Sequence, residues 1–257
     1  MQGNTHNSRL RLIRVSFADQ PAYGTAVSEA IMRRVAAGRL PATLRLHHPA
    51  RELAFSKQDT ASAGFGPAVR AARGVGFEPV VRLAGGRAAA FHEGTLAIAW
   101  SRPEANPVAG TRARFDELAE IVVAALRRLG VDARVGAVPG EYCPGAWSVN
   151  AREQVKLAGI GQRLIAGAAH LGCVLVVSDR ALLRSALEPV YAALDLEWNP
   201  ATAGAVEDEA PGASLADVER ALLAELGARY ELSDAELDPD TLDLAQRLES
   251  AHRPPDR

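Results

Sequence analysis

Short strand-like segments are spread over the first 198 residues of this chain. Residues 10–17 alternate apolar and polar side chains, and residues 171–178 are rich in β-branched residues, both typical of strands. Further short apolar segments lie at residues 43–47, 53–55, 89–91, 95–100, 147–149 and 155–157. Turn residues predict two hairpins, one joining 89–91 to 95–100 and one joining 147–149 to 155–157. Strands this short are stable only when they pair, so the chain must build a sheet.

Helical spacing of apolar residues is clearest over residues 111–129, which Gly130 ends. The residues of this apolar face are Phe115, Leu118, Val122, Leu126 and Leu129. Pro21 begins a second predicted helix over residues 21–37, and further helices are predicted over residues 65–73 and 180–194. Because the connections are short, we expect helices packed on one face of the sheet. The sequence therefore predicts an α+β fold with a mixed β-sheet and helices packed on it.

The end of the chain differs in composition from the rest. Residues 199–212 are rich in Pro, Gly, Ala and acidic residues, which indicates a linker. Residues 215–226 carry one apolar stripe, and residues 233–249 are predicted to hold a second helix. A single stripe needs a surface to cover, so this segment should dock on the body or on a partner, and a partly ordered appendage remains the alternative. We expect a main domain over residues 1–198 and a linker with a short helical C-terminal tail over residues 199–257.

Composition excludes several classes of function. The formal net charge is −2, so no basic field is available for nucleic acid. Two cysteines in 257 residues do not form a disulfide framework. No apolar stretch approaches the roughly 18 residues of a membrane span, and residues 1–14 do not resemble a signal peptide. We therefore expect a cytoplasmic protein that uses free thiols, binds neither nucleic acid nor membrane, and has no metal site.

The first candidate cluster runs from Arg82 to Arg87 and includes Gly85 and Gly86, with His92 shortly after it. Paired glycines let a backbone approach a ligand and offer N–H groups to it, and arginines add charge for a carboxylate or phosphate. A plain tight turn remains the alternative for the glycines, and a turn role remains the alternative for the histidine.

The second candidate is Cys143, which lies in a Gly/Pro-rich segment over residues 136–145. Inert cysteines are usually buried on regular elements, whereas a loop allows the exposure that a reactive thiol needs. An incidental loop cysteine remains the alternative. Cys173 is the useful contrast, because it lies within an apolar strand and is expected to be structural.

The third candidate is Lys156, which has apolar neighbours and is followed by Gly159, Gly161 and Gln162. A half-buried ammonium in this position suits an acyl carbonyl, an acyl phosphate or a thiolate. A lysine at a hairpin edge with its head in solvent remains the alternative.

In this order and spacing, the three clusters resemble the lipoate–biotin protein ligase superfamily, which includes lipoate-protein ligases and octanoyltransferases. The matching positions are Arg82, Gly85, Gly86, His92, the Lys-x-x-Gly sequence from Lys156 to Gly159, Gln162 and the strand led by His170. The resemblance covers roughly residues 10–195. It implies a biotin/lipoate protein ligase-like catalytic domain over residues 1–198.

Two features resemble the cysteine-dependent octanoyltransferases of the lipoate-ligase-like branch. Gly85-Gly86-Arg87 is similar to the Gly-Gly-Arg of that branch, where ATP-dependent ligases typically have a third glycine. Cys143 lies in the loop where those transferases carry their nucleophile. The resemblance implies that Cys143 carries the acyl group as a thioester, and that Lys156 lowers its pKa and stabilises the oxyanion. The implied substrate-binding residues are Arg82, Gly85, Gly86, Arg87, His92, Gly159 and Gln162.

The resemblance implies transfer of an octanoyl or lipoyl group from an acyl carrier protein or another acyl donor to a lysine of a lipoyl-domain protein, without a cofactor. Two alternatives stay open. An ATP-dependent lipoate-protein ligase would use ATP and Mg with Lys156 and the glycines, but would not need Cys143. A non-catalytic protein that binds a lipoyl domain or an acyl ligand would need neither residue.

Overall fold

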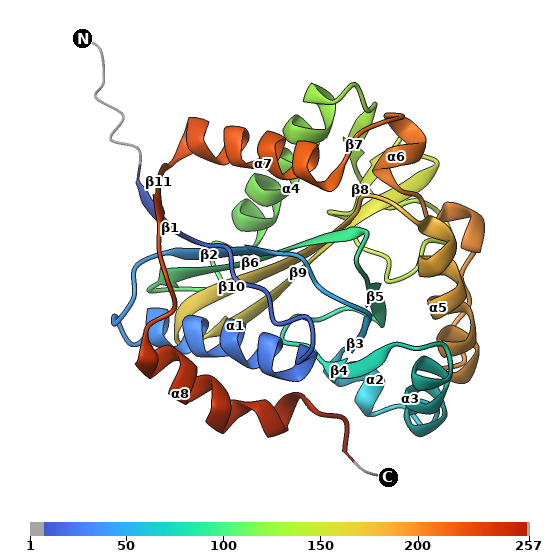
Figure 1. The fold of residues 1–257 in the computed structure, drawn as a ribbon, viewed down its shortest axis with the longest axis horizontal. Coiled ribbons are helices and arrows are strands. Elements are labelled where there is room, and N and C mark those ends of the chain that lie inside the picture. Colours follow the sequence, from blue (N-terminus) through green and yellow to red (C-terminus); the bar gives the residue numbers. More distant parts are fainter. Residues whose placement is uncertain (1–7, 256–257) are drawn as a thin grey trace.

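An eight-stranded mixed sheet crosses the computed structural model, which describes residues 8–255 (Figure 1). In spatial order its strands are β11 (Glu231–Asp234), β1 (Arg9–Ile13), β2 (Thr43–His47), β6 (Thr95–Glu104), β10 (Gly167–Val176), β9 (Val155–Ile165), β8 (Val149–Ala151) and β7 (Ala133–Val135). The first three strands are parallel to one another, and every later pair of neighbours is antiparallel. This sheet confirms the predicted α+β fold.

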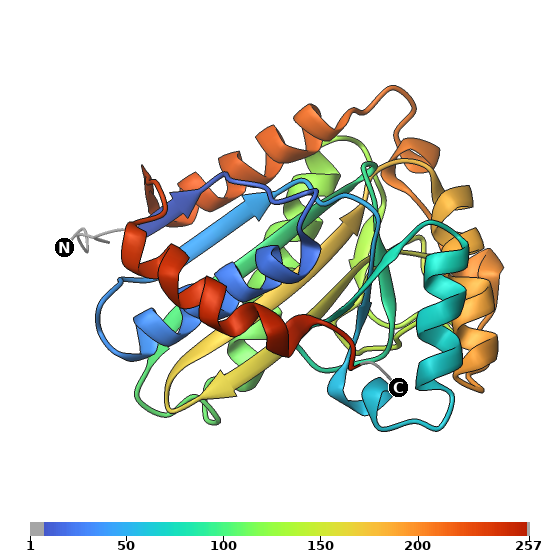
Figure 2. The ribbon, with the colours of Figure 1, turned by 60° about the horizontal axis from the view of Figure 1, so that its bottom comes forward.

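Helices cover both faces of this large sheet (Figures 1 and 2). α1 (Pro21–Ala36) and α8 (Pro239–Leu248) pack together on one face, while α4 (Thr111–Arg128) and α7 (Leu215–Arg229) cover the other. The expectation of helices on a single face is therefore wrong. Successive side chains of a strand point to opposite faces of the sheet, and in β2 apolar and polar residues alternate. Nearly all of these side chains are buried, so both faces of the sheet are covered.

A smaller three-stranded sheet lies beside the large one and is built from β4 (Glu78–Val81), β3 (Glu52–Phe55) and β5 (Ala89–Phe91). α3 (Phe65–Gly74) and α5 (Arg180–Ala193) lie side by side and share an apolar core with it (Figure 2). The short helix α2 (Lys57–Thr60) follows β3. The small sheet matters for function because the chain between β4 and β5 is the glycine-containing segment singled out above.

One of the two predicted hairpins is wrong. β5 pairs with β3 in the small sheet, whereas β6 pairs with β2 and β10 in the large sheet. The turn between them carries the chain from one sheet to the other, and Gly94 accepts backbone bonds from Val177 and Ser178 rather than closing a hairpin. The second hairpin is confirmed, because β8 and β9 pair with Ala151 opposite Val155.

The segment after residue 198 docks on the body, as its apolar stripe predicts. α7 packs against α4, β11 pairs with β1, and α8 packs against α1. The predicted linker also contains the short elements η1 (Pro200–Thr202) and α6 (Val206–Glu209), and η2 (Glu249–His252) is the last element of the described chain. A division at residue 198 stays a proposal, and it does not correspond to a gap in the packing. Within residues 8–255, none of the helices combines the length and apolar character that a membrane span needs.

We expect a fragment that lacks residues 199–257 not to fold. Val218, Leu222 and Leu226 of α7 are fully buried in the core of the large sheet. Burying side chains of this size stabilises a protein by about 1.5–3 kcal/mol each, and their sum rivals a typical net stability of about 5–15 kcal/mol. Circular dichroism during heating tests this, with removal of residues 254–257 alone as the control. A cooperative unfolding transition in the long truncation would contradict the expectation.

Candidate active site

A cavity of about 460 Å³ lies on the face of the large sheet that α1 also covers. Small residues form its floor: Gly161 on β9 pairs with Gly172 on β10, which pairs with Ala99 on β6. A Cβ on Gly161 would lie 3.0 Å from the Cβ of Ala84 in the opposite wall, so the floor and this wall are already in contact there. The volume falls within the range of about 300–1,000 Å³ that small-molecule sites usually have.

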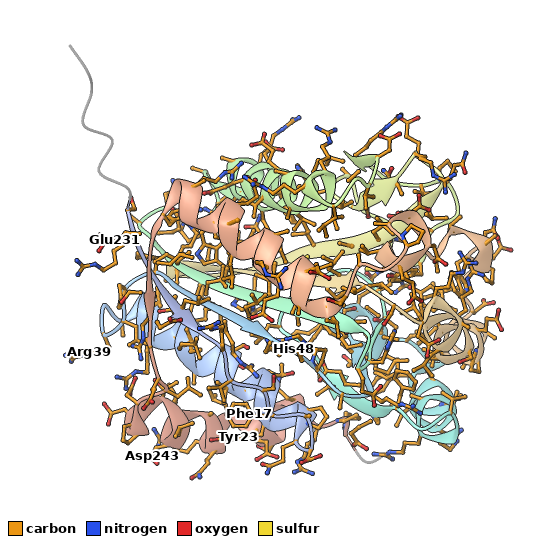
Figure 3. All side chains as sticks on the ribbon, turned by 45° about the horizontal axis from the view of Figure 1, so that its top comes forward. Phe17, Tyr23, Arg39, His48, Glu231 and Asp243 are labelled. Atoms are coloured by element: carbon orange, nitrogen blue, oxygen red, sulfur yellow. The ribbon has the colours of Figure 1, made fainter. Side chains whose placement is uncertain are left out.

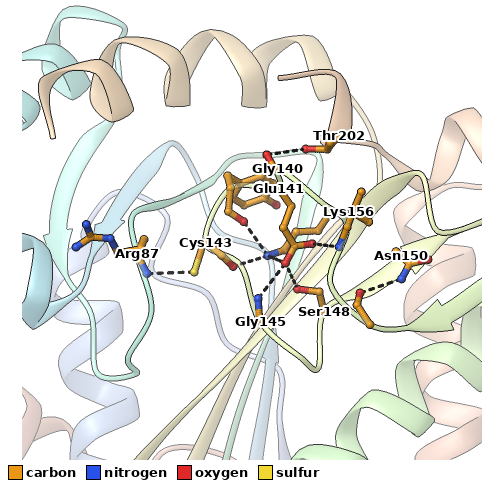
Figure 4. A network of polar contacts seen from close by, with 12 residues as sticks. Arg87, Gly140, Glu141, Cys143, Gly145, Ser148, Asn150, Lys156 and Thr202 are labelled. Atoms are coloured by element: carbon orange, nitrogen blue, oxygen red, sulfur yellow. Dashed lines mark hydrogen bonds and ion pairs between the residues drawn. The ribbon is translucent and has the colours of Figure 1, made fainter. Parts of the chain in front are cut away.

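Cys143 lies at the β9 side of this cavity, in the cysteine loop (residues 136–148) between β7 and β8 (Figure 4). Its Sγ accepts a hydrogen bond from the backbone N–H of Arg87 at 3.1 Å and lies 3.6 Å from Nη2 of Arg82. Burial by itself would raise the pKa of the Cys143 thiol. The charges of Arg82 and Lys156 and the N–H of Arg87 outweigh burial and lower that pKa below its ordinary value. The thiol is therefore disposed to ionise.

Lys156 lies beside the cysteine loop and holds it in place (Figure 4). Its ammonium is only 1% exposed and donates to the backbone oxygens of Tyr142 at 2.9 Å and Cys143 at 2.7 Å. A third contact joins it to Oε1 of Glu141 at 3.3 Å. An ammonium has three donors, so all of them are in use. Burial lowers the pKa of Lys156, while Cys143 and Glu141 oppose that shift. The alternative of a lysine head in solvent is therefore wrong.

Glu141 organises the same loop, and the sequence analysis assigned it no role. Its buried carboxylate accepts hydrogen bonds from the backbone N–H groups of Val138 at 3.1 Å and Gly145 at 3.0 Å. It also accepts one from the hydroxyl of Ser148 at 2.6 Å. A loop whose donors converge on one buried carboxylate is held in a single conformation. The only sequence signal was an acidic residue inside an otherwise Gly/Pro-rich loop.

Tyr191 is a second residue that sequence reasoning missed. Its hydroxyl oxygen accepts from the backbone N–H of Cys143 at 2.8 Å and donates to the backbone oxygen of Ala88 at 2.9 Å. It therefore ties the cysteine loop to the glycine loop (residues 82–88) between β4 and β5. No pattern distinguished it, because a tyrosine on the buried face of α5 is typical of a core residue.

The glycine loop packs directly against the thiol. Arg82 donates from Nη2 to the backbone oxygens of Gly85 and Arg87, both at 2.7 Å, which fixes the turn between them. The side chain of Arg87 pairs with the buried Asp59 at 3.3 Å, which orients the residue whose N–H binds the thiol. Gly86 has φ +99°, a conformation that favours glycine.

Gly86→Ala should slow reactions of the Cys143 thiol by roughly ten- to a hundred-fold. A Cβ on Gly86 would lie 2.8 Å from Sγ of Cys143 and 2.7 Å from Nη2 of Arg82, so either the thiol or the loop must move. Such overpacking costs about 1–3 kcal/mol, and about 1.4 kcal/mol is a factor of ten. Iodoacetamide labelling of Cys143 followed by mass spectrometry measures the rate. Gly74→Ala is the control, because nothing lies within 4 Å of that added Cβ. Equal labelling rates in the two variants would contradict this packing.

The structure brings most of the sequence-predicted residues to one place. Those that line the cavity are Arg82, Gly85, Gly86, Cys143, Lys156, Gly159 and Gln162. Arg87 contributes its backbone N–H to the thiol rather than its side chain. His92 is not brought to the cavity, because its ring is buried in the turn after β5, where Nδ1 accepts from the N–H of Gly94 at 3.0 Å. Cys173 is buried on β10, and burial raises its pKa to about 12.

Known proteins resemble the chain in sequence. The family model described as the lipoyl protein ligase A/B catalytic domain matches residues 20–227. An octanoyl-GcvH:protein N-octanoyltransferase of Geobacillus kaustophilus is 26% identical over 162 residues, which are 63% of this chain and 57% of that protein. The relative of the same name from Exiguobacterium sibiricum is 31% identical over 116 residues, which are 44% of this chain and 40% of that protein. The matched segments span about half the length of these curated relatives.

Solved structures share the fold. A putative lipoate protein ligase from T. acidophilum has a TM-score of 0.75 at 20% sequence identity, with 95% of each chain covered. A lipoate-protein ligase A bound with ATP has a TM-score of 0.77 at 21% identity, with 95% of this chain and 94% of that chain covered. These likenesses confirm the ligase-like fold of the chain.

Proposed function

Because the chain belongs to the family of lipoyl protein ligase A/B catalytic domains, we propose that it is an acyltransferase with Cys143 as its nucleophile. It would move an octanoyl or lipoyl group, through a thioester on this cysteine, to a lysine of a lipoyl-domain protein. The observation that carries the proposal is the placement of an ionisable thiol beside an apolar cavity, between Arg82 and the N–H of Arg87.

The proposed first step is a thioester exchange. The Cys143 thiolate attacks the carbonyl carbon of the donor thioester, and the carbon–sulfur bond to the donor breaks as its thiolate leaves. The hydrogen bonds from Arg82 and Arg87 hold the negative sulfur before this step. Once the sulfur is acylated, the N–H of Arg87 is free to bind the carbonyl oxygen, on which charge develops in the next tetrahedral intermediate, and the charge of Arg82 lies nearby.

The proposed second step forms an amide. A neutral lysine amine of the acceptor attacks the acyl-enzyme carbonyl carbon, the Cys143 thiolate leaves, and the proton lost by the amine nitrogen passes to that thiolate, which restores the thiol. Lys156 serves both steps without touching the acyl group, because its donors hold the cysteine loop and its charge lies near the sulfur. In this scheme Lys156 is a positioning residue.

The ligase alternative meets a specific difficulty in this geometry. A ligase would need Lys156 to bind a phosphate or carboxylate oxygen, but its three donors already bind the backbone oxygens of Tyr142 and Cys143 and the carboxylate of Glu141. ATP therefore does not fit the lysine as it is placed here. The binder alternative leaves unexplained why a buried carboxylate and a buried ammonium both hold the Cys143 loop.

The donor and the cellular location belong to the same proposal. The curated relatives are named for octanoyl-GcvH, so an acylated lipoyl-domain protein is a candidate donor beside an acyl carrier protein. The acceptor would be a lipoyl-domain protein. A nucleophilic thiol must stay reduced, which suits the cytoplasm.

Incubation with an octanoyl-carrier protein, without ATP, tests the function. We expect intact-mass spectrometry to show one octanoyl group on the chain and peptide mapping to place it on Cys143. A subsequent addition of a lipoyl-domain protein should remove the group and acylate that protein. Turnover only with free octanoate and ATP would indicate a ligase instead. No acylation under either condition would favour the non-catalytic binder.

A further inference from the structure

The side of the cavity opposite Cys143 carries three ionisable side chains: Arg45 and His47 on β2 and Glu52 on β3. The cysteine loop is fastened to β9, and β10 and β6 separate β9 from β2. Neighbouring strands lie about 4.8 Å apart, so the floor of the cavity extends roughly 14 Å from one side to the other. An acyl chain on Cys143 that follows this floor is therefore directed toward the three polar side chains.

Arg45 is a buried cation without a carboxylate partner. Its side chain is 1% exposed, and its Nε donates to the backbone oxygen of Val15 at 2.8 Å. Its Nη1 donates to the backbone oxygen of Gly24 at 2.7 Å and to the hydroxyl of Ser28 at 3.1 Å. These partners are neutral, and no carboxylate within residues 8–255 lies at ion-pair distance from the guanidinium. Buried charges in proteins are ordinarily paired, so a polar group of a ligand would stabilise this guanidinium.

The surroundings of Arg45 hold it at the cavity wall. The guanidinium lies 5.3 Å from the ring centre of Phe17, and this ring packs edge-on against Tyr23, with ring centres 5.0 Å apart (Figure 3). Phe17 precedes α1, and Tyr23 lies in its first turn. Nη2 makes none of the hydrogen bonds described above. The bonds from Nε and Nη1 thus hold the guanidinium in place, and Nη2 is left to donate to a ligand.

The side chains of Glu52 and His47 are also available to a ligand in the cavity. Burial raises the pKa of Glu52 to about 7, although Arg45 works against that shift. Nδ1 of His47 is buried and has no hydrogen-bond partner among the residues that the structure describes. Burial lowers the pKa of His47 well below its ordinary value, so the ring is neutral. Unmade hydrogen bonds of buried groups are costly, typically about 1–3 kcal/mol each.

A methyl-ended chain would leave these groups unsatisfied. An extended chain advances about 1.2 Å per bond, so the last carbon of an octanoyl group lies about 9 Å from its carbonyl carbon. The floor is roughly 14 Å across, which is about 5 Å more than the length of this chain. The side chain of Arg45 is long enough to span that difference. A chain of this length that ends in an oxygen or sulfur atom would instead accept a hydrogen bond where a methyl group cannot.

We propose that the cavity selects acyl chains of about octanoyl length whose far end carries a hydrogen-bond acceptor, to which Arg45 and His47 donate, with Glu52 beside them. This inference rests on the proposed acyl transfer through Cys143 and names the substrate class of that transfer. The shared chemistry is an acceptor near the eighth carbon. A hydroxyl, a carboxyl group and the sulfur atoms of a lipoyl ring all supply one.

Single-turnover acylation of the full chain tests the inference. Four thioesters of one small thiol are compared, carrying octanoyl, 8-hydroxyoctanoyl, lipoyl and suberyl groups, and mass spectrometry follows acylation of Cys143. We expect at least one polar-ended chain to react about tenfold faster than octanoyl at low concentration, because one more hydrogen bond to a charged group is worth about that factor. The fastest of the three identifies the acceptor atom. Equal or faster reaction of octanoyl would overturn the inference while leaving the acyl transfer intact. No acylation by any of the four would overturn both.

Variants of the polar side chains sharpen the test. Glu52→Leu places an apolar side chain beside Arg45 and His47 and should weaken the preference, whereas Glu78→Leu, which makes the same change on the neighbouring strand at an exposed position outside the cavity, should keep it. Arg45→Met is the second variant, and circular dichroism must first show that it folds, because Arg45 also anchors Val15 and Gly24. An unchanged preference in Glu52→Leu would show that Glu52 takes no part, and a preference that survives in a folded Arg45→Met would show that these side chains do not select the chain. The comparison of the four thioesters tests the selection itself even if Arg45→Met is unfolded.

Discussion

Cys143→Ala should lower acyl transfer by about 10³-fold or more and eliminate the acyl-enzyme, since removal of a covalent nucleophile usually has an effect of this size. The substitution removes the atom that lies beside Arg82 and the N–H of Arg87. It leaves untouched the backbone contacts of Cys143 with Lys156 and Tyr191. The protein should therefore fold normally. Rates of octanoyl transfer from a carrier protein to a lipoyl domain, together with thermal unfolding curves, provide the measurement.

Cys173→Ala is the matched control for that experiment. The second thiol is buried on β10, and its raised pKa of about 12 keeps it protonated at neutral pH. Its loss should lower the melting temperature, because the variant leaves a small cavity in the core, and should leave transfer close to the wild-type rate. Wild-type transfer by Cys143→Ala, or loss of transfer in a folded Cys173→Ala, would mean that the nucleophile is misassigned.

Lys156→Met should reduce both transfer and stability. Without the ammonium, the backbone oxygens of Tyr142 and Cys143 lose their donor, and the buried carboxylate of Glu141 loses its counter-ion. Breaking a buried ion pair costs about 3–5 kcal/mol. The positive charge also helps to lower the pKa of Cys143, so its removal should raise that pKa. We expect iodoacetamide labelling of the thiol to need a higher pH in this variant, and transfer to fall by roughly 10²-fold or more.

A double variant separates these two effects of Lys156. Lys156→Met combined with Glu141→Gln removes both buried charges, so much of the lost stability should return. The thiol still lacks the nearby cation, so its labelling curve should stay at higher pH. Thermal unfolding and labelling as a function of pH measure the two quantities independently. A labelling curve that coincides with the wild-type curve in both variants would show that Lys156 does not tune the thiol.

Local sequence patterns predicted the elements whose stability depends on local chemistry. The helix around Leu118 and Leu126 runs from Thr111 to Arg128, within one residue of the expected span, because apolar spacing and a terminal glycine set its limits. Asp179 caps α5, as an aspartate directly before a helix typically does, with its side chain accepting from the N–H of Leu182 at 3.0 Å. The α+β class followed from such elements together.

The same patterns missed the floor of the cavity. The lysine strand was expected to end at Leu157, but β9 continues to Ile165 through Gly159 and Gly161. Glycine disfavours strands locally, so the sequence does not indicate an extension there. Pairing with β10 along its length stabilises the strand, and the absent side chains are what leave room for a ligand.

The sequence by itself determined the fold class and the residue types of the site: Cys143 in a loop, a glycine pair before it and Lys156 after it. Only the tertiary structure decided their roles. It placed the Arg87 N–H on the thiol, turned Lys156 toward loop carbonyls and excluded His92 from the cavity. The physical reason is that helices and turns depend on neighbours a few residues away, whereas a site depends on contacts between distant segments that leave no periodic pattern in the sequence.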